Sequence, residues 1–292
     1  MTDKKITTIR LVIYCFLSFV PFWIILPIMN NHFGETVYTC EVAQAATYAL
    51  GVFGMLIPSI AHIITRLVTK EGFKNTYLSI NFKGNAKWYL ASIGIKVLEG
   101  IIGALLIWRV FAGDLSFKSA FSLETPKTLI GMILLQLAFS IIVFFPAFGE
   151  EWGWRGYMMP KLIKLLGKPA AILVGGIIWG LWHAPLTIAG HNFGTDYFGY
   201  PFIGIALMCL MCVLFNAFLT LLTEKTGSVY PASFSHIINN NINAPLLIAI
   251  AGSSALTKAV EGTSAVSVFL ITSLPLLLIT GVLSYYLIQR KG

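Results

Sequence analysis

Charged residues are scarce in this chain. Aspartate, glutamate, lysine and arginine make up 11% of the 292 residues, against about a quarter in an ordinary soluble domain, and the mean hydropathy is +0.81. A soluble globular fold is therefore excluded. Alternating segments of about ten residues, which an outer-membrane barrel needs, are also absent from the sequence. The four cysteines do not form a disulfide framework, because most of them lie within apolar runs.

Long apolar runs take the place of these features. Each is about 20 residues long, which is the length needed to cross the hydrocarbon core of a bilayer. Backbone polar groups must be satisfied within such a segment, so each run is expected to be a helix. We predict an all-α, polytopic membrane bundle that forms one domain, residues 1–292, with about eight transmembrane helices. The predicted spans are Ile9–Met29, Ala43–Thr65, Trp88–Trp108, Thr128–Phe148, Pro169–Ile188, Phe202–Leu222, Val229–Ala251 and Ala265–Leu287.

The net charge of +8 is distributed unevenly along these spans. If alternate loops face the cytoplasm, starting with the N-terminus, fifteen basic residues lie on the cytoplasmic side and four on the other. This is the positive-inside pattern, and it predicts a cell-membrane protein with both termini in the cytoplasm. The basic residues are then expected to meet anionic lipid head groups of the bilayer, and no nucleic-acid partner is predicted.

A few ionisable residues interrupt the apolar runs. Glu150 and Glu151 end one run, and His183 and His236 lie inside later ones. An ionisable group at membrane depth costs several kcal/mol unless it is paired or hydrated, so it indicates a functional site. Counted from the nearest basic boundary at 1.5 Å per residue, Glu150 and His236 lie about 16 Å deep and His183 about 22 Å deep. Three helices thus bring polar groups to similar depths.

Helical spacing separates the roles of these residues. Glu150 and Glu151 are about 100° apart on a helix and cannot both point equally into one site. Arg155 is four residues after Glu151, which favours an ion pair and leaves Glu150 as the freer carboxylate. Asn240 is four residues after His236 and shares its face, so its side chain can hold a substrate carbonyl or oxyanion beside the imidazole.

Three motifs in this order carry a family resemblance. Glu150-Glu151-x-x-x-Arg155, Trp179-x-x-x-His183 and His236-x-x-x-Asn240 resemble the CAAX-protease and bacteriocin-processing family, also called the Abi family. The match covers about residues 128–251, which we interpret as the catalytic core. Trp179 stands where phenylalanine is common in the family.

The resemblance implies an intramembrane endopeptidase that hydrolyses a membrane-associated or leader-type peptide, or a membrane-protein substrate. It implies that Glu150 activates water, that His183 orients this water, and that His236 with Asn240 stabilises the oxyanion. Glu151, Arg155 and Trp179 are then supporting residues.

Two questions stay open at this point. Glu150, His183 and His236 could instead be the ligands of a catalytic zinc ion, because two histidines and a glutamate form such sites. The sequence lacks an H-E-x-x-H motif, so we favour water activation by Glu150 without a metal or other cofactor. A non-catalytic bacteriocin immunity protein is the main alternative function. A transporter with a proton relay ranks lower, because two related halves are absent from the sequence.

Overall fold

The computed structural model describes residues 2–33, 52–111, 143–241 and 264–289, and within these ranges the chain forms helices and turns, with no strand. The predicted all-α class is therefore confirmed. In chain order the elements are α1 (Asp3–Phe33), α3 (Ile57–Val68), α4 (Ala86–Phe111), a helix over residues 143–153, the π-helix η2 (Trp154–Met158), α7 (Met159–Leu166), α8 (Lys168–Trp182), α9 (Ala184–Ile188), α10 (Phe202–Thr226), α11 (Tyr230–Asn241), α13 (Ala265–Thr272) and α14 (Leu274–Gln289).

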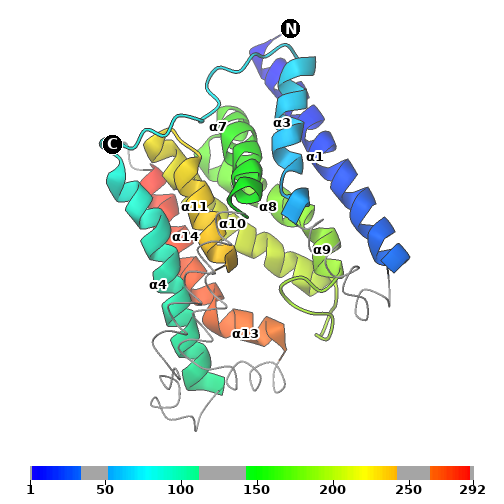
Figure 1. The fold of residues 1–292 in the computed structure, drawn as a ribbon, viewed down its shortest axis with the longest axis vertical. Coiled ribbons are helices and arrows are strands. Elements are labelled where there is room, and N and C mark those ends of the chain that lie inside the picture. The colour runs from blue at the N-terminus through cyan, green and yellow to red at the C-terminus, as the bar shows by residue number, and fades with distance from the viewer. Residues whose placement is uncertain (1, 34–51, 112–142, 242–263, 290–292) are drawn as a thin grey trace.

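Helix α10 lies at the centre of the bundle. It packs against α8, α11 and α14. At one edge α1 pairs with α3, and at the other α4 packs against α11 and α13 (Figure 1). The helical stretch 143–166 lies between these edges, since α7 contacts both α1 and α8. This arrangement brings the residues of the three predicted motifs into the interior, with the exception of Asn240. They lie on η2 and the preceding helix, at the end of α8, and on α11.

Two glycines of α8 set how closely it approaches α10. A methyl group on Gly176 would lie 2.4 Å from the Cα atom of Val213, and one on Gly180 would lie 2.4 Å from the Cα atom of Cys209. Small residues at a helix crossing allow this close approach in membrane bundles. Because Gly180 lies three residues before His183, the crossing also fixes the position of the second motif.

The described part of the chain supports a membrane protein but does not confirm eight spans. Three of its helices are long and apolar enough to cross a membrane, namely Asp3–Ile28, Ala86–Val110 and Phe202–Thr226. The pair α13 and α14, bent by 45°, adds a fourth if it counts as one span. Three predicted spans extend beyond the described residues: Ala43–Thr65 before residue 52, Thr128–Phe148 before residue 143, and Val229–Ala251 after residue 241.

Two predicted spans are broken where they were expected to be continuous. Pro169–Ile188 ends as α8 at Trp182 and restarts as α9 at Ala184, and Ala265–Leu287 divides at Ser273. In each case a proline, Pro185 or Pro275, follows the break by two residues. Proline donates no backbone hydrogen bond, and its ring clashes with the carbonyl four residues earlier, which explains both breaks. These prolines were visible in the sequence and could have predicted the breaks, which hydropathy alone does not indicate.

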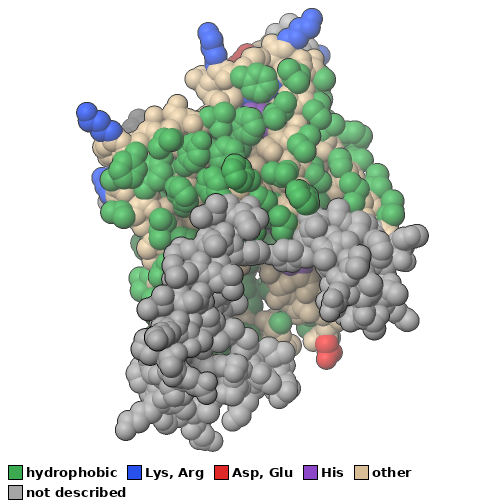
Figure 2. Space-filling view, in the orientation of Figure 1, with side chains coloured by type: hydrophobic (Ala, Val, Ile, Leu, Met, Phe, Trp, Pro, Cys, Tyr) green, Lys and Arg blue, Asp and Glu red, His purple; other side chains and the backbone are tan. Residues whose placement is uncertain are grey.

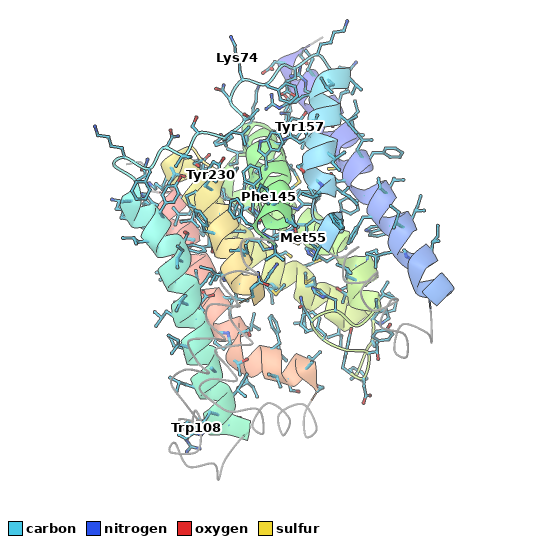
Figure 3. The ribbon with its side chains drawn as sticks, in the orientation of Figure 1. Met55, Lys74, Trp108, Phe145, Tyr157 and Tyr230 are labelled. Carbon is cyan, nitrogen blue, oxygen red and sulfur yellow. The ribbon has the colours of Figure 1, made fainter. Side chains whose placement is uncertain are left out.

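Basic side chains gather at one end of the molecule. Figure 2 shows Lys and Arg at this end, above a band of exposed apolar side chains. Lys74 lies at this end and Trp108 at the opposite one (Figure 3). The start of α1 and the end of α14 also lie at the basic end (Figure 1). This placement fits two termini on the same side of a membrane, while their assignment to the cytoplasm stays a prediction.

One carboxylate, that of Glu71, forms ion pairs with basic residues from three helices at the basic end. Glu71, in the loop between α3 and α4, lies 3.4 Å from Arg10 of α1, 3.9 Å from Arg66 of α3 and 2.8 Å from Lys161 of α7. The Tyr157 hydroxyl also donates a hydrogen bond to Glu71 at 2.9 Å. Burial alone would raise the pKa of Glu71, but the hydrogen bonds and charges of Lys161, Tyr157 and Arg66 outweigh it and hold the pKa below its usual value.

The substitution Glu71→Gln should lower the stability of the protein by about 2 kcal/mol at neutral pH, because it leaves three cations without their shared anion. Since the pKa of Glu71 is lower in the folded state, its contribution is present above the unfolded value of 4.5 and is lost as the pH falls through the folded value. The difference between wild type and variant in thermal unfolding should therefore shrink below about pH 4.5. Asp3→Asn, which removes the exposed pair with Lys164, is the matched control and should change stability by less than about 1 kcal/mol. Equal effects of the two substitutions would contradict this role of Glu71.

Candidate active site

The two glutamates lie where a regular helix gives way to a π turn. The chain stays helical from residue 143 to Leu166, and Trp154–Met158 adopts the π form. Both carboxylates are buried, with Glu150 1% and Glu151 0% exposed. A π turn inserts an extra residue and is frequent at functional sites, because it changes the direction of the side chains that follow.

Glu150 is held through one of its oxygens by two indoles. Its Oε1 atom accepts hydrogen bonds from Trp179 Nε1 at 2.5 Å and from Trp154 Nε1 at 3.3 Å. Among the described residues, none donates a hydrogen bond to Oε2. As expected, Glu151 makes the ion pair and none is formed by Glu150 among the described residues. The tryptophan donors fix Glu150 Oε1, and Oε2 is left to act on another molecule; Glu151 Oε2 also has no described hydrogen-bond partner.

Glu151 makes the predicted ion pair and a second contact that the spacing did not indicate. Its Oε1 atom accepts from Arg155 Nη1 at 2.9 Å and lies 2.7 Å from His236 Nδ1. A carboxylate accepts but does not donate when ionised, so His236 Nδ1 carries a proton and donates it here. Glu151 thus orients the imidazole of His236, much as a carboxylate orients the histidine of a hydrolytic triad.

His183 occupies the break between α8 and α9. Its Nδ1 atom lies 2.9 Å from the backbone oxygen of Trp179. A carbonyl oxygen can only accept, so Nδ1 must be the donor. In the neutral imidazole this leaves Nε2 without a proton, as a hydrogen-bond acceptor. The hydrogen bond to Trp179 therefore leaves His183 Nε2 able to accept a hydrogen bond from water.

Asn240 lies at the rim of the site. His236 is 4% exposed, but Asn240, one turn later on α11, is exposed to solvent. Its Oδ1 atom accepts a weak hydrogen bond from Asn239 Nδ2 at 3.3 Å. The structure does not bring the Asn240 side chain into the buried cluster with Glu151 and His236.

Trp179 contacts four of the other predicted site residues: Glu150, His183, Arg155 and His236. Besides its bonds to Glu150 and His183, its ring lies 4.0 Å from the Arg155 guanidinium and 5.7 Å from the His236 ring. The sequence analysis included Trp179 only as a supporting residue. Trp154 was missed, although its spacing of four residues from Glu150 is a signal that could have found it.

Phe215 of α10 is a further neighbour that the sequence analysis missed. Its ring lies 6.0 Å from that of His236 and 5.9 Å from that of Trp179. The Nζ atom of Lys96, paired with Glu99 at 2.7 Å, lies 4.0 Å from the centre of the Phe215 ring. No polar motif marks a phenylalanine in an apolar run, so the sequence offers no signal for it.

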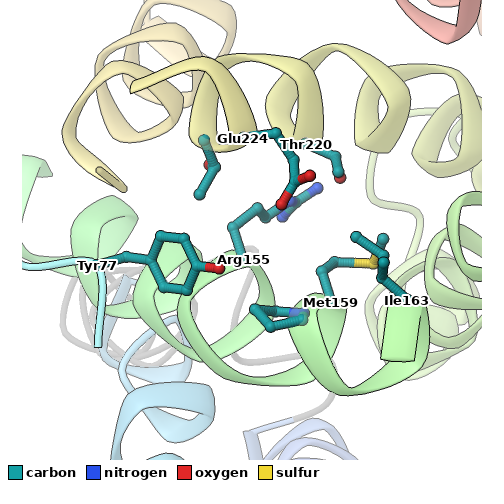
Figure 4. Close-up of a pocket in the computed structure, with 8 residues that line it drawn as sticks. Tyr77, Arg155, Met159, Ile163, Thr220 and Glu224 are labelled. Atoms are coloured by element: carbon teal, nitrogen blue, oxygen red, sulfur yellow. The ribbon is translucent and has the colours of Figure 1, made fainter. Parts of the chain in front are cut away.

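A small cavity borders Arg155. It measures about 10 Å³, close to the space that one water needs, and Tyr77, Met159, Thr220 and Glu224 contribute to its lining (Figure 4). The Nε and Nη2 atoms of Arg155 have no hydrogen-bond partner among the described residues. The cavity has room for about one water molecule and not for a peptide.

The zinc alternative finds little support in this arrangement. Within the described ranges no three His, Cys, Asp or Glu side chains gather as a group that could hold a metal ion. We therefore derive no step through a metal, and metal independence stays a prediction.

Comparison with known proteins identifies the region that carries these residues. Residues 127–242 match the model of the family described as Type II CAAX prenyl endopeptidase Rce1-like. The resemblance predicted from the three motifs is confirmed. This Rce1-like region contains all seven predicted site residues, from Glu150 to Asn240, and covers less than half of the 292 residues.

A curated relative matches over a similar share of the chain. CAAX prenyl protease 2 of Methanococcus maripaludis is 30% identical over 156 residues, in an alignment that covers 50% of this chain and 52% of that protein. The chain therefore spans about half the length of the relative that it matches.

The substitution Glu151→Gln should destabilise the protein by about 3–5 kcal/mol, because it leaves the buried charge of Arg155 without its anion. Thermal or denaturant unfolding in detergent measures this change. Glu224→Gln is the control, because Glu224 pairs with Lys168 at 3.1 Å and is 29% exposed, so about 1 kcal/mol or less is expected. A Glu151→Gln protein as stable as wild type would show that this carboxylate does not hold the cluster.

Proposed function

We propose that this protein is an intramembrane endopeptidase that hydrolyses a peptide bond with water activated by Glu150. The observation that carries the proposal is the buried cluster of Glu150, Glu151, His183 and His236 around Trp179, inside an apolar helical bundle. Burial of so many ionisable groups is costly in a membrane protein and marks a functional site. The match to a family of endopeptidases supports the same conclusion.

Glu150 acts as the general base. Its Oε2 atom accepts a proton from a water molecule, and the oxygen of that water attacks the carbonyl carbon of the peptide bond. His183 Nε2 accepts a second hydrogen bond from the water and so orients it. When the C–N bond breaks, the proton held by Glu150 passes to the leaving amine, which restores the carboxylate.

His236 acts on the charge that develops on the carbonyl oxygen. Because Glu151 binds Nδ1, the opposite nitrogen of the ring points away from Glu151. With a proton on each ring nitrogen, Nε2 donates a hydrogen bond to the oxyanion, which is worth about two to three orders of magnitude in rate for a single donor. Asn240, at the rim, supplies a second donor when the substrate is bound.

The substrate that we propose is a peptide whose chain ends in a prenylated CAAX sequence. The relative from Methanococcus maripaludis is named a CAAX prenyl protease. In such sequences the cysteine carries an isoprenoid, which partitions into the bilayer and would deliver the peptide to a site at membrane depth. We also propose a cell-membrane location with both termini cytoplasmic, so that the basic end faces the compartment that holds such substrates.

Purified protein in nanodiscs and a synthetic farnesylated CAAX peptide test this function. Wild type should release the C-terminal tripeptide, and Glu150→Gln, His183→Ala and His236→Ala should each lower kcat at least about a hundredfold, because each removes a proton-transfer or oxyanion group. Asp3→Asn, on the exposed surface, is the control and should keep full activity. An active Glu150→Gln enzyme would remove the proposed base, and a folded wild type that cleaves nothing would favour a non-catalytic immunity protein.

Chelation separates the two mechanisms within the same assay. If Glu150 activates water without a metal, cleavage should persist after exhaustive treatment with chelator, and the active protein should contain no stoichiometric zinc. Activity that disappears with chelator and returns with zinc would instead assign Glu150, His183 and His236 as ligands.

A further inference from the structure

Tyr14 packs a buried phenol against the π turn that follows Glu150, although its helix α1 lies outside the Rce1-like region. The side chain is fully buried. Its ring packs against Trp154 at 5.7 Å and Tyr157 at 5.1 Å, both in the π turn that follows the glutamates. Trp154 in turn donates its indole hydrogen bond to Glu150 Oε1 at 3.3 Å. The first helix therefore contributes a polar group to a site that the motifs place on later helices.

A second hydroxyl lies one turn further along the same face of α1. Tyr14 Oη and Ser18 Oγ are both buried, and neither makes a hydrogen bond to a described residue. A buried hydroxyl without a partner costs about 1–3 kcal/mol. Phenylalanine and alanine at these positions would avoid that cost while keeping the packing. The two hydroxyls are therefore expected to bind a molecule that occupies the site.

Ser18 also borders the histidine side of the site. Its backbone oxygen accepts a hydrogen bond from Trp182 Nε1 at 3.0 Å. The Trp182 ring in turn lies 4.8 Å from the ring of His183. The segment from Tyr14 to Ser18 thus contacts Trp154 and Trp182, the tryptophans that touch Glu150 and His183. We assign the attacking water to these last two residues.

We propose that the hydroxyls of Tyr14 and Ser18 position the attacking water against Glu150. A buried water makes two to four hydrogen bonds, and these two hydroxyls and the carboxylate provide three. The phenol donates to the water oxygen, and the water donates its protons to Glu150 Oε2 and to Ser18 Oγ or His183 Nε2. The second lone pair of the water oxygen is then free to attack the carbonyl carbon. This role rests on the proposed hydrolytic function, whereas the presence of the water does not.

Radiolytic footprinting in nanodiscs tests the water without an activity assay. An X-ray pulse converts bound water to hydroxyl radicals, which oxidise adjacent side chains even when these are buried, and mass spectrometry reads the products. Tyr157 is the matched control, since it is equally buried and packs against the Tyr14 ring itself, but its hydroxyl binds Glu71. Tyr14 should be oxidised several-fold faster than Tyr157, and Ser18→Val should abolish the difference by filling the space. Equal background oxidation of both tyrosines would overturn the proposal.

Kinetics of the conservative variants test the positioning role. Tyr14→Phe should lower kcat about tenfold with KM unchanged, because it removes one hydrogen bond to the water and no contact to the peptide. Tyr157→Phe should leave kcat unchanged. If Tyr14→Phe keeps the wild-type kcat, the positioning role is wrong and the peptidase proposal stands. If wild type cleaves no peptide, the proposed function fails, and footprinting alone decides whether the hydroxyls hold a water.

Discussion

The indole of Trp179 connects the parts of the site that the sequence scatters over three helices. The indole N–H group of Trp179 donates to Glu150, and the indole ring packs against Arg155 and His236. The backbone oxygen of the same residue accepts from His183. These contacts require α8 to lie close to the glutamate helix and to α11. The glycine crossing between α8 and α10 provides that closeness, so the fold of the bundle and the geometry of the site depend on the same helix packing.

Burial explains why the polar residues are arranged as they are. In an apolar bundle an unpartnered charge costs far more than it does in water, and each carboxylate and imidazole of the cluster has at least one protein partner. Glu151 accepts from Arg155 and His236, and Glu150 accepts from two indole donors. Among the described residues, Glu150 Oε2 and the distal nitrogens of the two histidines make no hydrogen bond, and the same is true of Glu151 Oε2 and of Arg155 Nε and Nη2. The proposed mechanism uses the first three of these atoms, for the water and for the oxyanion.

The sequence predicted the parts of this structure that depend on composition and spacing. Apolar runs indicated helices such as α1, α4 and α10, and the four-residue spacing indicated the pair of Glu151 with Arg155. The sequence analysis did not predict the breaks at His183 and Ser273. Hydropathy is averaged over a whole segment, so it does not register the steric effect of a single proline on the helix backbone. The contact of His236 with Glu151, which spans 85 residues of sequence, arises from tertiary packing and has no local signal.

The central claim is that a water molecule activated by Glu150 attacks the peptide bond directly. Cleavage of a farnesylated CAAX peptide in ¹⁸O-labelled water, read by mass spectrometry, tests it most directly. The account predicts that the new carboxyl group of the prenylated product carries one ¹⁸O atom after a single turnover, and that hydroxylamine traps no acylated protein. A hydroxamate product or an acyl-enzyme on any side chain would contradict it, because either would require a protein nucleophile in place of water.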